Sequence, residues 1–315
     1  MTSYAKDDIR SQLASVPATR VPVDPSTPVS PGQYLEFTDR APTAVSPAGS
    51  RTWVTRGQNV VLVWTDAVAG DRLPRTGQPD EYAVLLYSDS AAIRVTAGGD
   101  GTDDSAGAGE RQEVDEEAFV VVPPGDSVIE VLTDGPVVRL FSSLAEDLSD
   151  TAVNADTYAG PDPRCAPLVP WPEPVGGFRL RVYRLADTPI SEGRFGRIFR
   201  TTNLMVNFLA EEPSPRNPLK LSPHTHDDFE QLSLAVKGEF IHHLQYPWGP
   251  DSTQWRPEEH SGVGSPSLTV IPPPAVHTTQ GVGPYQQLID IFSPPRQDFS
   301  ARPGWVLNET DYPAR

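Results

Sequence analysis

The sequence predicts an all-β protein built from two similar domains in tandem. Thirty-five prolines and 24 glycines separate short runs of Val, Ile, Leu, Phe and Tyr along the 315 residues. Short apolar runs bounded by turn-forming residues are typical of strands. A chain of this length has room for about two hydrophobic cores. A single shift, which carries Arg75 onto His224, aligns two segments of the first half with two of the second. This self-similarity indicates a duplicated domain.

The repeat is visible in two places that lie well apart in the sequence. Residues 73–87 align with residues 222–236 without a gap, and the same shift of 149 residues places Pro123 on Pro272. Because one shift serves both segments, duplication explains them better than chance similarity does.

Composition divides the chain into four segments. Residues 1–50 are rich in Pro, Ser, Thr and Ala and predict an extended arm. Residues 51–150 should form the first barrel, residues 151–176 a stiff proline-dense connection, and residues 177–315 the second barrel. Inside the first barrel, the Gly-rich and acidic residues 98–117 lack apolar periodicity and predict a mobile loop. Strands are expected at 60–64, 119–122, 137–141, 178–183 and 288–292, and short helices near 7–14 and 143–150.

The histidines predict a metal site in the second half. All six of them lie between His224 and His277. His224 and His226 are one residue apart on an extended segment, so their side chains point to the same side. His277 follows a Pro-rich turn on a separate strand. Three imidazoles are therefore expected to reach one divalent ion.

These motifs resemble those of the cupin superfamily, in which His-x-His, an acidic position and a Gly are followed by a Pro-containing turn and a third His. The resemblance covers both halves of the chain. It implies two cupin barrels in tandem, each a double-stranded β-helix or jelly roll. It also implies one divalent metal ion (Fe, Mn, Ni or Zn) in the second barrel, bound by His224, His226, His277 and a fourth residue. At the equivalent positions the first copy has side chains that suit no divalent metal, so we expect no metal there: Arg75, Gly77, Tyr82 and Val128.

The identity of the fourth ligand depends on the face of one strand. The cupin spacing, counted back from Gly238, gives Gln231, whereas Glu230 comes one residue early. Gln231 shares its face with small and polar residues, and Glu230 shares the other face with Leu and Val. We therefore predict Gln231 as the fourth ligand and keep Glu230 as the alternative.

The other histidines and aromatic residues are assigned more ordinary roles. His242 and His243 are adjacent and must face opposite ways, so we expect them and His260 to be supporting or surface residues. Three aromatic residues between the two motifs are candidates for a lid, a sugar-stacking wall, or a domain or dimer contact: Tyr246, Trp248 and Trp255.

Asp290 and Arg296 are the candidate catalytic residues. Asp290 interrupts an apolar strand, and burial there would raise its pKa and make it a usable acid or base. The alternative is a salt bridge to an arginine without a chemical role. Arg296 leaves the same strand at a rigid Pro-Pro exit. Further cations near the barrel strands suggest an anionic substrate, or else surface ion pairs: Arg200, Lys237 and Arg256.

Charge and composition limit the class of partner. The net charge of −17 and a pI of about 4.7 argue against nucleic acid or an anionic membrane. The N-terminus lacks the features of a secretory signal, and the single Cys165 allows no internal disulfide, so a cytoplasmic location is expected. The oligomeric state stays open between monomer and homodimer.

The expected function is that of a metal-dependent enzyme acting on a small polar, anionic molecule such as a sugar acid or keto acid. Isomerase or lyase chemistry is favoured because cupins with a similar ligand set and a nearby Asp include enzymes of sugar-acid metabolism. An Fe(II)-dependent cupin dioxygenase is one alternative. A non-catalytic metal- or sugar-binding bicupin is the other.

Overall fold

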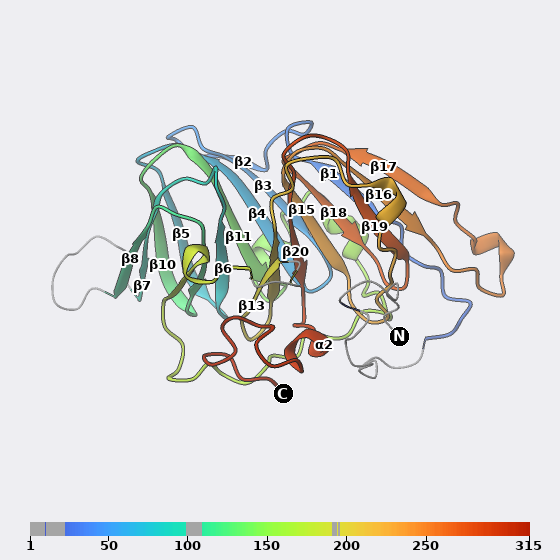
Figure 1. The fold of residues 1–315 in the computed structure, drawn as a ribbon. Helices are drawn as coiled ribbons and strands as arrows, with labels where there is room; N and C mark the ends of the chain where they lie inside the picture. Colours follow the sequence, from blue (N-terminus) through green and yellow to red (C-terminus); the bar gives the residue numbers. More distant parts are fainter. Residues whose placement is uncertain (1–9, 11–22, 99–108, 191–193, 195) are drawn as a thin grey trace.

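The computed structural model describes residues 10, 23–98, 109–190, 194 and 196–315. In these residues the chain forms two β-barrels that lie side by side (Figure 1). Each barrel consists of one large and one small antiparallel sheet. The predicted all-β class is confirmed.

The first barrel is formed by a seven-stranded and a four-stranded sheet. The large sheet has the order β12-β9-β6-β11-β4-β3-β2, and its strands are β2 (Ala44–Val45), β3 (Arg51–Arg56), β4 (Val60–Ala67), β6 (Tyr82–Leu86), β9 (Ala118–Val122), β11 (Gly135–Ser142) and β12 (Arg181–Arg184). The small sheet has the order β5-β10-β7-β8, with β5 (Arg72–Gln78), β7 (Ile93–Ala97), β8 (Glu110–Val114) and β10 (Gly125–Val131).

The second barrel is formed by a six-stranded and a three-stranded sheet. The large sheet has the order β1-β18-β15-β20-β14-β13, with β1 (Gln33–Glu36), β13 (Gly196–Arg200), β14 (Met205–Leu209), β15 (Gln231–Lys237), β18 (Ser267–Ile271) and β20 (Gln287–Phe292). The small sheet has the order β17-β16-β19, with β16 (Phe240–Gln245), β17 (Glu259–Val263) and β19 (Val276–Gly281). The described helices are short: α1 (Glu146–Ser149), α2 (Gln297–Ser300), η2 (Ala155–Tyr158), η3 (Leu185–Asp187), η4 (Pro218–Lys220) and η5 (Ser252–Gln254).

The pairing of equivalent strands in the two barrels follows the shift predicted from the sequence repeat. In the first barrel, β6 pairs with β9 from Tyr82↔Val122 onward. In the second, β15 pairs with β18 from Gln231↔Ile271 onward. Both members of each pair move by the same 149 residues. In these two pairs of strands the barrels therefore match in register as well as in sequence.

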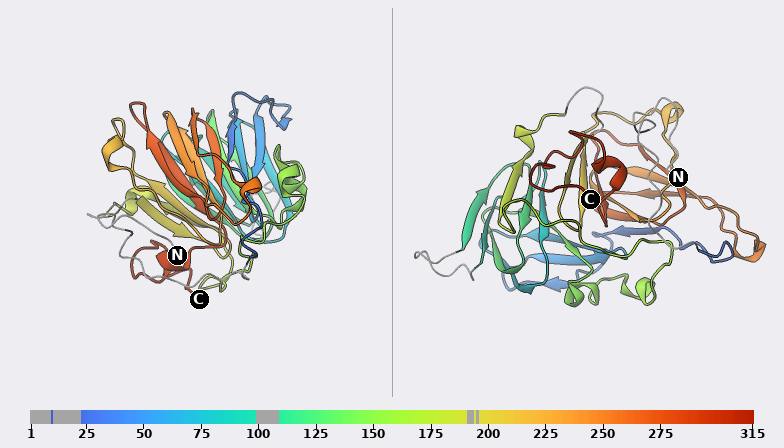
Figure 2. Two further views of the ribbon diagram at one scale, coloured as in Figure 1. Left: turned by 90° about the vertical axis from the view of Figure 1, so that its right-hand side faces the viewer. Right: turned by 90° about the horizontal axis from the view of Figure 1, so that it is seen from below.

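The barrels exchange an edge strand, and the domain boundaries change accordingly. β1, in the N-terminal arm, pairs with β18 of the second barrel. β12, which follows the proline-dense connection, pairs with β9 of the first. The first barrel thus includes β12, which lies within the segment 177–315 predicted for the second. The second barrel includes β1, which lies in the predicted arm. Figure 2 shows the arm at residues 23–36 running along the second barrel.

Two other local predictions have mixed outcomes. The helix near 143–150 is confirmed as α1. The helix near 7–14 lies outside the described residues except for Arg10. The irregular segment 98–117 contains β8, so that prediction was wrong for residues 110–114. β8 is an edge strand with four exposed residues of five, which explains why the sequence lacks an apolar pattern there.

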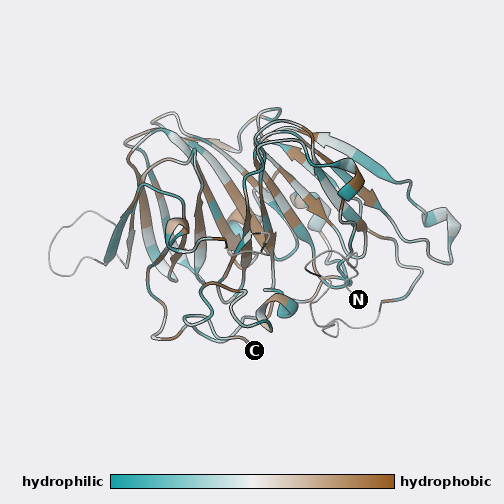
Figure 3. Ribbon diagram, viewed as in Figure 1, coloured by the Kyte–Doolittle hydropathy of each residue, from teal (hydrophilic) through white to brown (hydrophobic). Residues whose placement is uncertain are grey.

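The two large sheets pack face to face and share one core. This core joins Leu62, Leu85 and Phe119 of the first barrel to Phe199 and Leu234 of the second. Phe199 stacks on Phe119 with ring centroids 5.3 Å apart. Figure 3 shows apolar segments along these central strands and a mainly polar connection between β16 and β17. The second barrel is therefore held on a rigid support, and the inner face of its large sheet stays available for a site.

Phe199→Ala is expected to lower the free energy of unfolding by about 3–5 kcal/mol, since it removes a fully buried ring from the core between the barrels. Chemical denaturation followed by circular dichroism measures the change. Leu219→Ala, at a side chain that is 90% exposed, is the matched control and should have little effect. An equal loss in both variants would contradict a shared core.

Candidate metal centre

Three histidines meet inside the second barrel. His224, His226 and His277 are all buried, and their candidate ligand atoms lie within 4.8 Å of one another. A backbone bridge joins two of them: the His224 N–H donates to the His277 carbonyl at 3.0 Å, and the His277 N–H donates back at 2.8 Å. The separated motifs of the sequence are therefore brought together by strand pairing.

Backbone carbonyls orient two of the imidazoles. His224 Nδ1 donates to the Ser222 carbonyl at 2.9 Å, and His277 Nδ1 donates to the Ala275 carbonyl at 3.0 Å. A carbonyl only accepts, so each Nδ1 carries the proton and each neutral ring keeps a lone pair on Nε2. Burial holds the pKa of His224 well below its usual value and lowers that of His277 to about 4. Both rings are therefore neutral near pH 7, as metal binding requires.

Gln231 turns its carbonyl oxygen toward this cluster. Its Oε1 lies 2.9 Å from His226 Nε2 and 3.3 Å from His277 Nε2. Its Nε2 donates to Ser233 Oγ at 3.0 Å and to Asp290 Oδ1 at 3.1 Å. The two acceptors on the amide nitrogen fix which end of the side chain points at the histidines.

The donor set fits a divalent cation. Gln231 Oε1 and His277 Nε2 are both acceptors, yet they face each other at 3.3 Å. Two lone pairs at this distance repel unless a cation lies between them. Three imidazole nitrogens and one amide oxygen suit Mn²⁺, Fe²⁺, Ni²⁺ or Zn²⁺. His224, His226, Gln231 and His277 are the residues that would hold such an ion.

Glu230 lies on the opposite face of the strand, toward the first barrel. Its Oε2 accepts from the Gln58 N–H at 2.6 Å, and its Oε1 accepts from the Tyr158 hydroxyl at 3.1 Å. Burial raises the pKa of Glu230 to about 7. The structure thus places Gln231 and not Glu230 beside the histidines.

A cavity of about 540 Å³ adjoins the histidines. It is lined by Asp290 on β20 and by two guanidinium groups, those of Arg10 and Arg216. Arg216 donates to Ser222 Oγ and to the Thr279 carbonyl, both at 2.7 Å, and Arg10 donates to Ser222 Oγ at 3.1 Å. The two cations therefore converge next to His224.

Asp290 lies in this cavity, as its position in an apolar strand suggested. Its Oδ1 accepts from Ser233 Oγ at 2.7 Å and from the Gln231 amide. Burial raises the pKa of Asp290, and Arg10 and Arg296 act in the opposite direction. One carboxylate oxygen thus orients the candidate ligand Gln231.

Arg296 has a different environment from the one expected. Its guanidinium pairs with Asp298 at 2.6 Å and lies over the rings of Phe229, Phe292 and Phe299. It is not among the residues that line the cavity. Its charge still affects the site, because it helps to lower the pKa of His226.

The other predicted cations also lie elsewhere. Arg200 donates to the Tyr312 carbonyl and lies over Trp171, Arg256 donates to the Val29 carbonyl at 2.8 Å, and Lys237 pairs with Asp89 and Glu211. The cavity cations Arg10 and Arg216 were missed. Arg216 lies in an irregular proline-containing segment and Arg10 is more than 200 residues from the motifs, so no periodicity points to either.

The remaining histidines stay outside the cluster. His242 is buried and contacts Thr279 Oγ1 at 3.0 Å through Nδ1, whereas His243 faces His260 with Nδ1 atoms 2.8 Å apart. The predicted opposite orientation of the adjacent pair is confirmed. Trp248 and Trp255 stack on each other with centroids 4.4 Å apart and do not line the 540 Å³ cavity.

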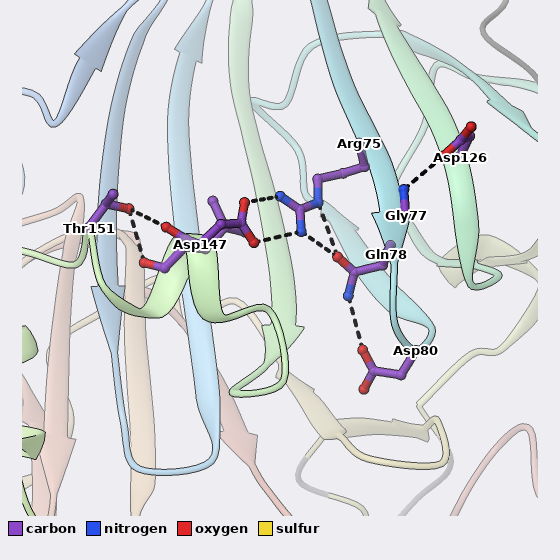
Figure 4. A network of polar contacts seen from close by, with 8 residues as sticks. Arg75, Gly77, Gln78, Asp80, Asp126, Asp147 and Thr151 are labelled. Atoms are coloured by element: carbon purple, nitrogen blue, oxygen red, sulfur yellow. Dashed lines mark hydrogen bonds and ion pairs between the residues drawn. The ribbon is translucent and has the colours of Figure 1, made fainter.

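In the first barrel, the equivalent positions hold no comparable cluster of metal ligands among the described residues. Arg75, in the place of His224, forms a two-pronged ion pair with Asp147 and hydrogen bonds with Gln78 (Figure 4). The prediction for Val128 was wrong by one residue: Ser127 pairs with Arg75, because the register shifts between Gly125 and Ser127.

Comparison with known proteins identifies the fold. No family model and no curated protein matches the sequence. Lactobacillus farciminis oxalate decarboxylase in its formate complex is 15% identical, with a TM-score of 0.57 over 89% of this chain and 93% of that one. A variant of Bacillus subtilis oxalate decarboxylase is 14% identical, with a TM-score of 0.56 over 90% and 84%. The same enzyme, studied for its Mn(II) centres, gives 14% and 0.55 over the same shares. The chain has the two-barrel cupin fold.

The arrangement combines three chemical elements in one cavity: a set of neutral ligands for a cation, the carboxyl groups of Asp290 and Glu212, and two guanidinium groups. Neutral ligands leave a bound divalent ion with its full charge.

In the described part of the chain, no helix combines the length and apolar character that a membrane span requires.

Proposed function

We propose that this two-barrel cupin protein is a metal-dependent enzyme acting on a small carboxylate, with lyase or isomerase chemistry. The observation that carries the proposal is the cavity, lined by Asp290, Arg10 and Arg216, that adjoins the three-histidine cluster. One divalent ion held by His224, His226, Gln231 and His277 would polarise a substrate oxygen as a Lewis acid.

The substrate class follows from the two guanidinium groups. Planar guanidinium groups recognise carboxylates through paired N–H donors. Arg10 and Arg216 meet at Ser222, two residues before His224, so a carboxylate bound there lies beside the cluster. Sugar acids, keto acids and dicarboxylates fit a cavity of about 540 Å³. The fold neighbours named for oxalate decarboxylation support a small acidic substrate and a lyase reaction.

The chain's own residues divide the remaining work. Arg10 and Arg216 bind and orient the acid, and their positive charge favours its anionic form. Asp290 takes up or returns a proton at its carboxylate, and burial tunes it for this task by raising its pKa. Its contact with Gln231 ties the proton carrier to the ligand set.

Metal analysis and a substrate panel test the proposal together. Protein purified without added metal should contain up to one equivalent of a divalent ion. After loading separately with Mn²⁺, Fe²⁺, Ni²⁺ and Zn²⁺, it should convert at least one sugar acid, keto acid or dicarboxylate, with product followed by NMR and carbon dioxide release. Oxygen consumption in step with turnover would instead select the dioxygenase. Metal binding without turnover across the panel would select the non-catalytic bicupin.

Asp290→Asn should reduce kcat by roughly 10²–10⁴-fold, the usual effect of losing a general acid or base, while metal content stays near that of the wild type. The amide keeps an oxygen that can accept from Ser233 and Gln231 but cannot carry the proton. Ser233→Ala, which removes a hydrogen bond to Asp290 and one from Gln231 but leaves the carboxylate in place, is the control and should have a much smaller effect. Unchanged kcat in Asp290→Asn would exclude this residue as the proton carrier.

A further inference from the structure

The interior of the first barrel contains a buried arginine at an unexpected position. Arg139 lies on β11 opposite Val63 of β4 and Val84 of β6. Both valines belong to the apolar interior of the barrel, so Arg139 points inward as well. Only 8% of its surface is exposed. Among the residues that the structure describes, its Nε has no hydrogen-bond partner.

Arg139 occupies the place that Asp290 has in the second barrel. Val84, which the repeat shift carries onto Ser233, pairs with Arg139, and Ser233 pairs with Asp290. The first barrel therefore has a guanidinium where the second has a carboxylate. The site in the first barrel has the opposite charge to its counterpart.

Hydroxyl groups replace two of the candidate metal ligands around this arginine. Tyr82 occupies the position of Gln231. Ser127 pairs with Arg75 in the first barrel, as His277 pairs with His224 in the second, so Ser127 occupies the position of His277. Tyr82 Oη and Ser127 Oγ lie 3.0 Å apart in the barrel interior. Both can donate a hydrogen bond to an anion.

The charge of Arg139 is not compensated in the same way as that of its neighbour. Arg75 and Arg139 lie on the ring of Phe141, at 5.1 and 5.8 Å from its centroid. Arg75 is neutralised by Asp147. Burial lowers the pKa of Arg139 to about 10, so it remains charged at neutral pH. Among the residues that the structure describes, no ion pair of Arg139 is found. A buried charge without a counter-ion is strongly unfavourable, which is a reason for an anion to bind.

We propose that the first barrel binds a small carboxylate anion between Arg139, Tyr82 and Ser127, without a metal. A guanidinium presents parallel N–H donors that match the two oxygens of a carboxylate, and the hydroxyls complete the donor set. The single charge of Arg139 matches a monoanion. This inference concerns the barrel that lacks the metal motif, so it stands independently of the proposed function.

Titration of the metal-free protein with formate, the smallest carboxylate, tests this site. The melting temperature should rise with formate and then saturate, because a ligand that binds only the folded state stabilises it. In an Arg216→Met background, which removes a carboxylate-binding cation of the second barrel, Arg139→Met should abolish this rise. It should also melt above the formate-free wild type, since an apolar side chain of similar length replaces an uncompensated charge. Arg216→Met, which changes a cation of the second barrel only, should keep the rise.

Two results would overturn the proposal. One is a saturable formate response of unchanged size when Arg139→Met is added to the Arg216→Met variant. The other is an Arg139→Met protein that melts below the formate-free wild type, which would mean that Arg139 serves packing over Phe141. Tyr82→Phe and Ser127→Ala give a second test if Arg139→Met does not fold. Each should weaken formate affinity by about tenfold, the scale of one hydrogen bond to a charged group, and unchanged affinity in both would also refute the site.

Discussion

His277→Ala is expected to lower metal content from near one equivalent to a small fraction, with affinity reduced on the order of 100-fold or more. His226→Ala should have the same effect. Each variant removes one of three imidazoles that face a common point. Loss of a ligand leaves two histidines and an amide, which hold first-row divalent ions weakly. Elemental analysis after dialysis and titration calorimetry with Mn²⁺ and Zn²⁺ measure the change.

Both variants should still fold, because neither histidine belongs to the large apolar cores of the protein. The far-ultraviolet circular dichroism spectrum should match that of the wild type. The rise in melting temperature that the metal gives to the wild type should be lost, since this rise depends on binding to the folded state. His260→Ala, at an exposed histidine outside the cluster, is the matched control and should keep its metal. One equivalent of metal retained in both His226→Ala and His277→Ala would refute the site.

The parts of the site that were predictable are those governed by strand geometry. Alternation along an extended segment places His224 and His226 on one side, and the same rule separates Gln231 from Glu230 and His242 from His243. The repeat shift predicted which strands of the two barrels correspond, and it holds in the pairing of β6 with β9 and of β15 with β18. Local periodicity was sufficient for these features.

Features that depend on the path of the chain between strands were not predictable. The exchange of β1 and β12 depends on where two irregular segments lie, and no residue pattern records it. One extra residue in β5 relative to β10 moves the partner of Arg75 from Val128 to Ser127. Arg296 follows a strand of the site but turns into a cluster of phenylalanines, which stabilise its charge through cation–π contacts. Proximity in sequence was a poor guide for this side chain.

The charge of the cavity also depends on the path of the chain and not on local sequence patterns. The whole chain carries a net charge of −17, yet two guanidinium groups converge beside His224. Net charge describes long-range attraction and solubility, whereas substrate binding depends on the few groups that line the cavity. An anionic substrate is therefore compatible with an acidic protein when its cations are placed inward.

Gln231→Ala is expected to weaken metal binding by about 10- to 100-fold, the scale seen for the loss of supporting contacts at metal sites. The amide oxygen lies at 2.9 and 3.3 Å from two imidazole nitrogens, and its amide nitrogen is held by Ser233 and Asp290. Gln231→Glu should retain the metal, since a carboxylate is also a ligand. The added negative charge would raise the pKa of water on the ion and slow turnover. Calorimetric titration and the pH dependence of activity measure these effects.

Glu230→Ala should leave metal affinity unchanged and lower stability. Its carboxylate accepts from the Gln58 N–H and the Tyr158 hydroxyl, which hold the loop before β4 and the connection between the barrels. Buried donors without an acceptor cost about 1–3 kcal/mol, so the free energy of unfolding should fall by about this amount. Glu230→Gln keeps an acceptor oxygen at the same place and should lose less. If Glu230→Ala lost the metal and Gln231→Ala kept it, the strand would lie one residue out of the register described, with Leu232 and Leu234 turned into the cavity.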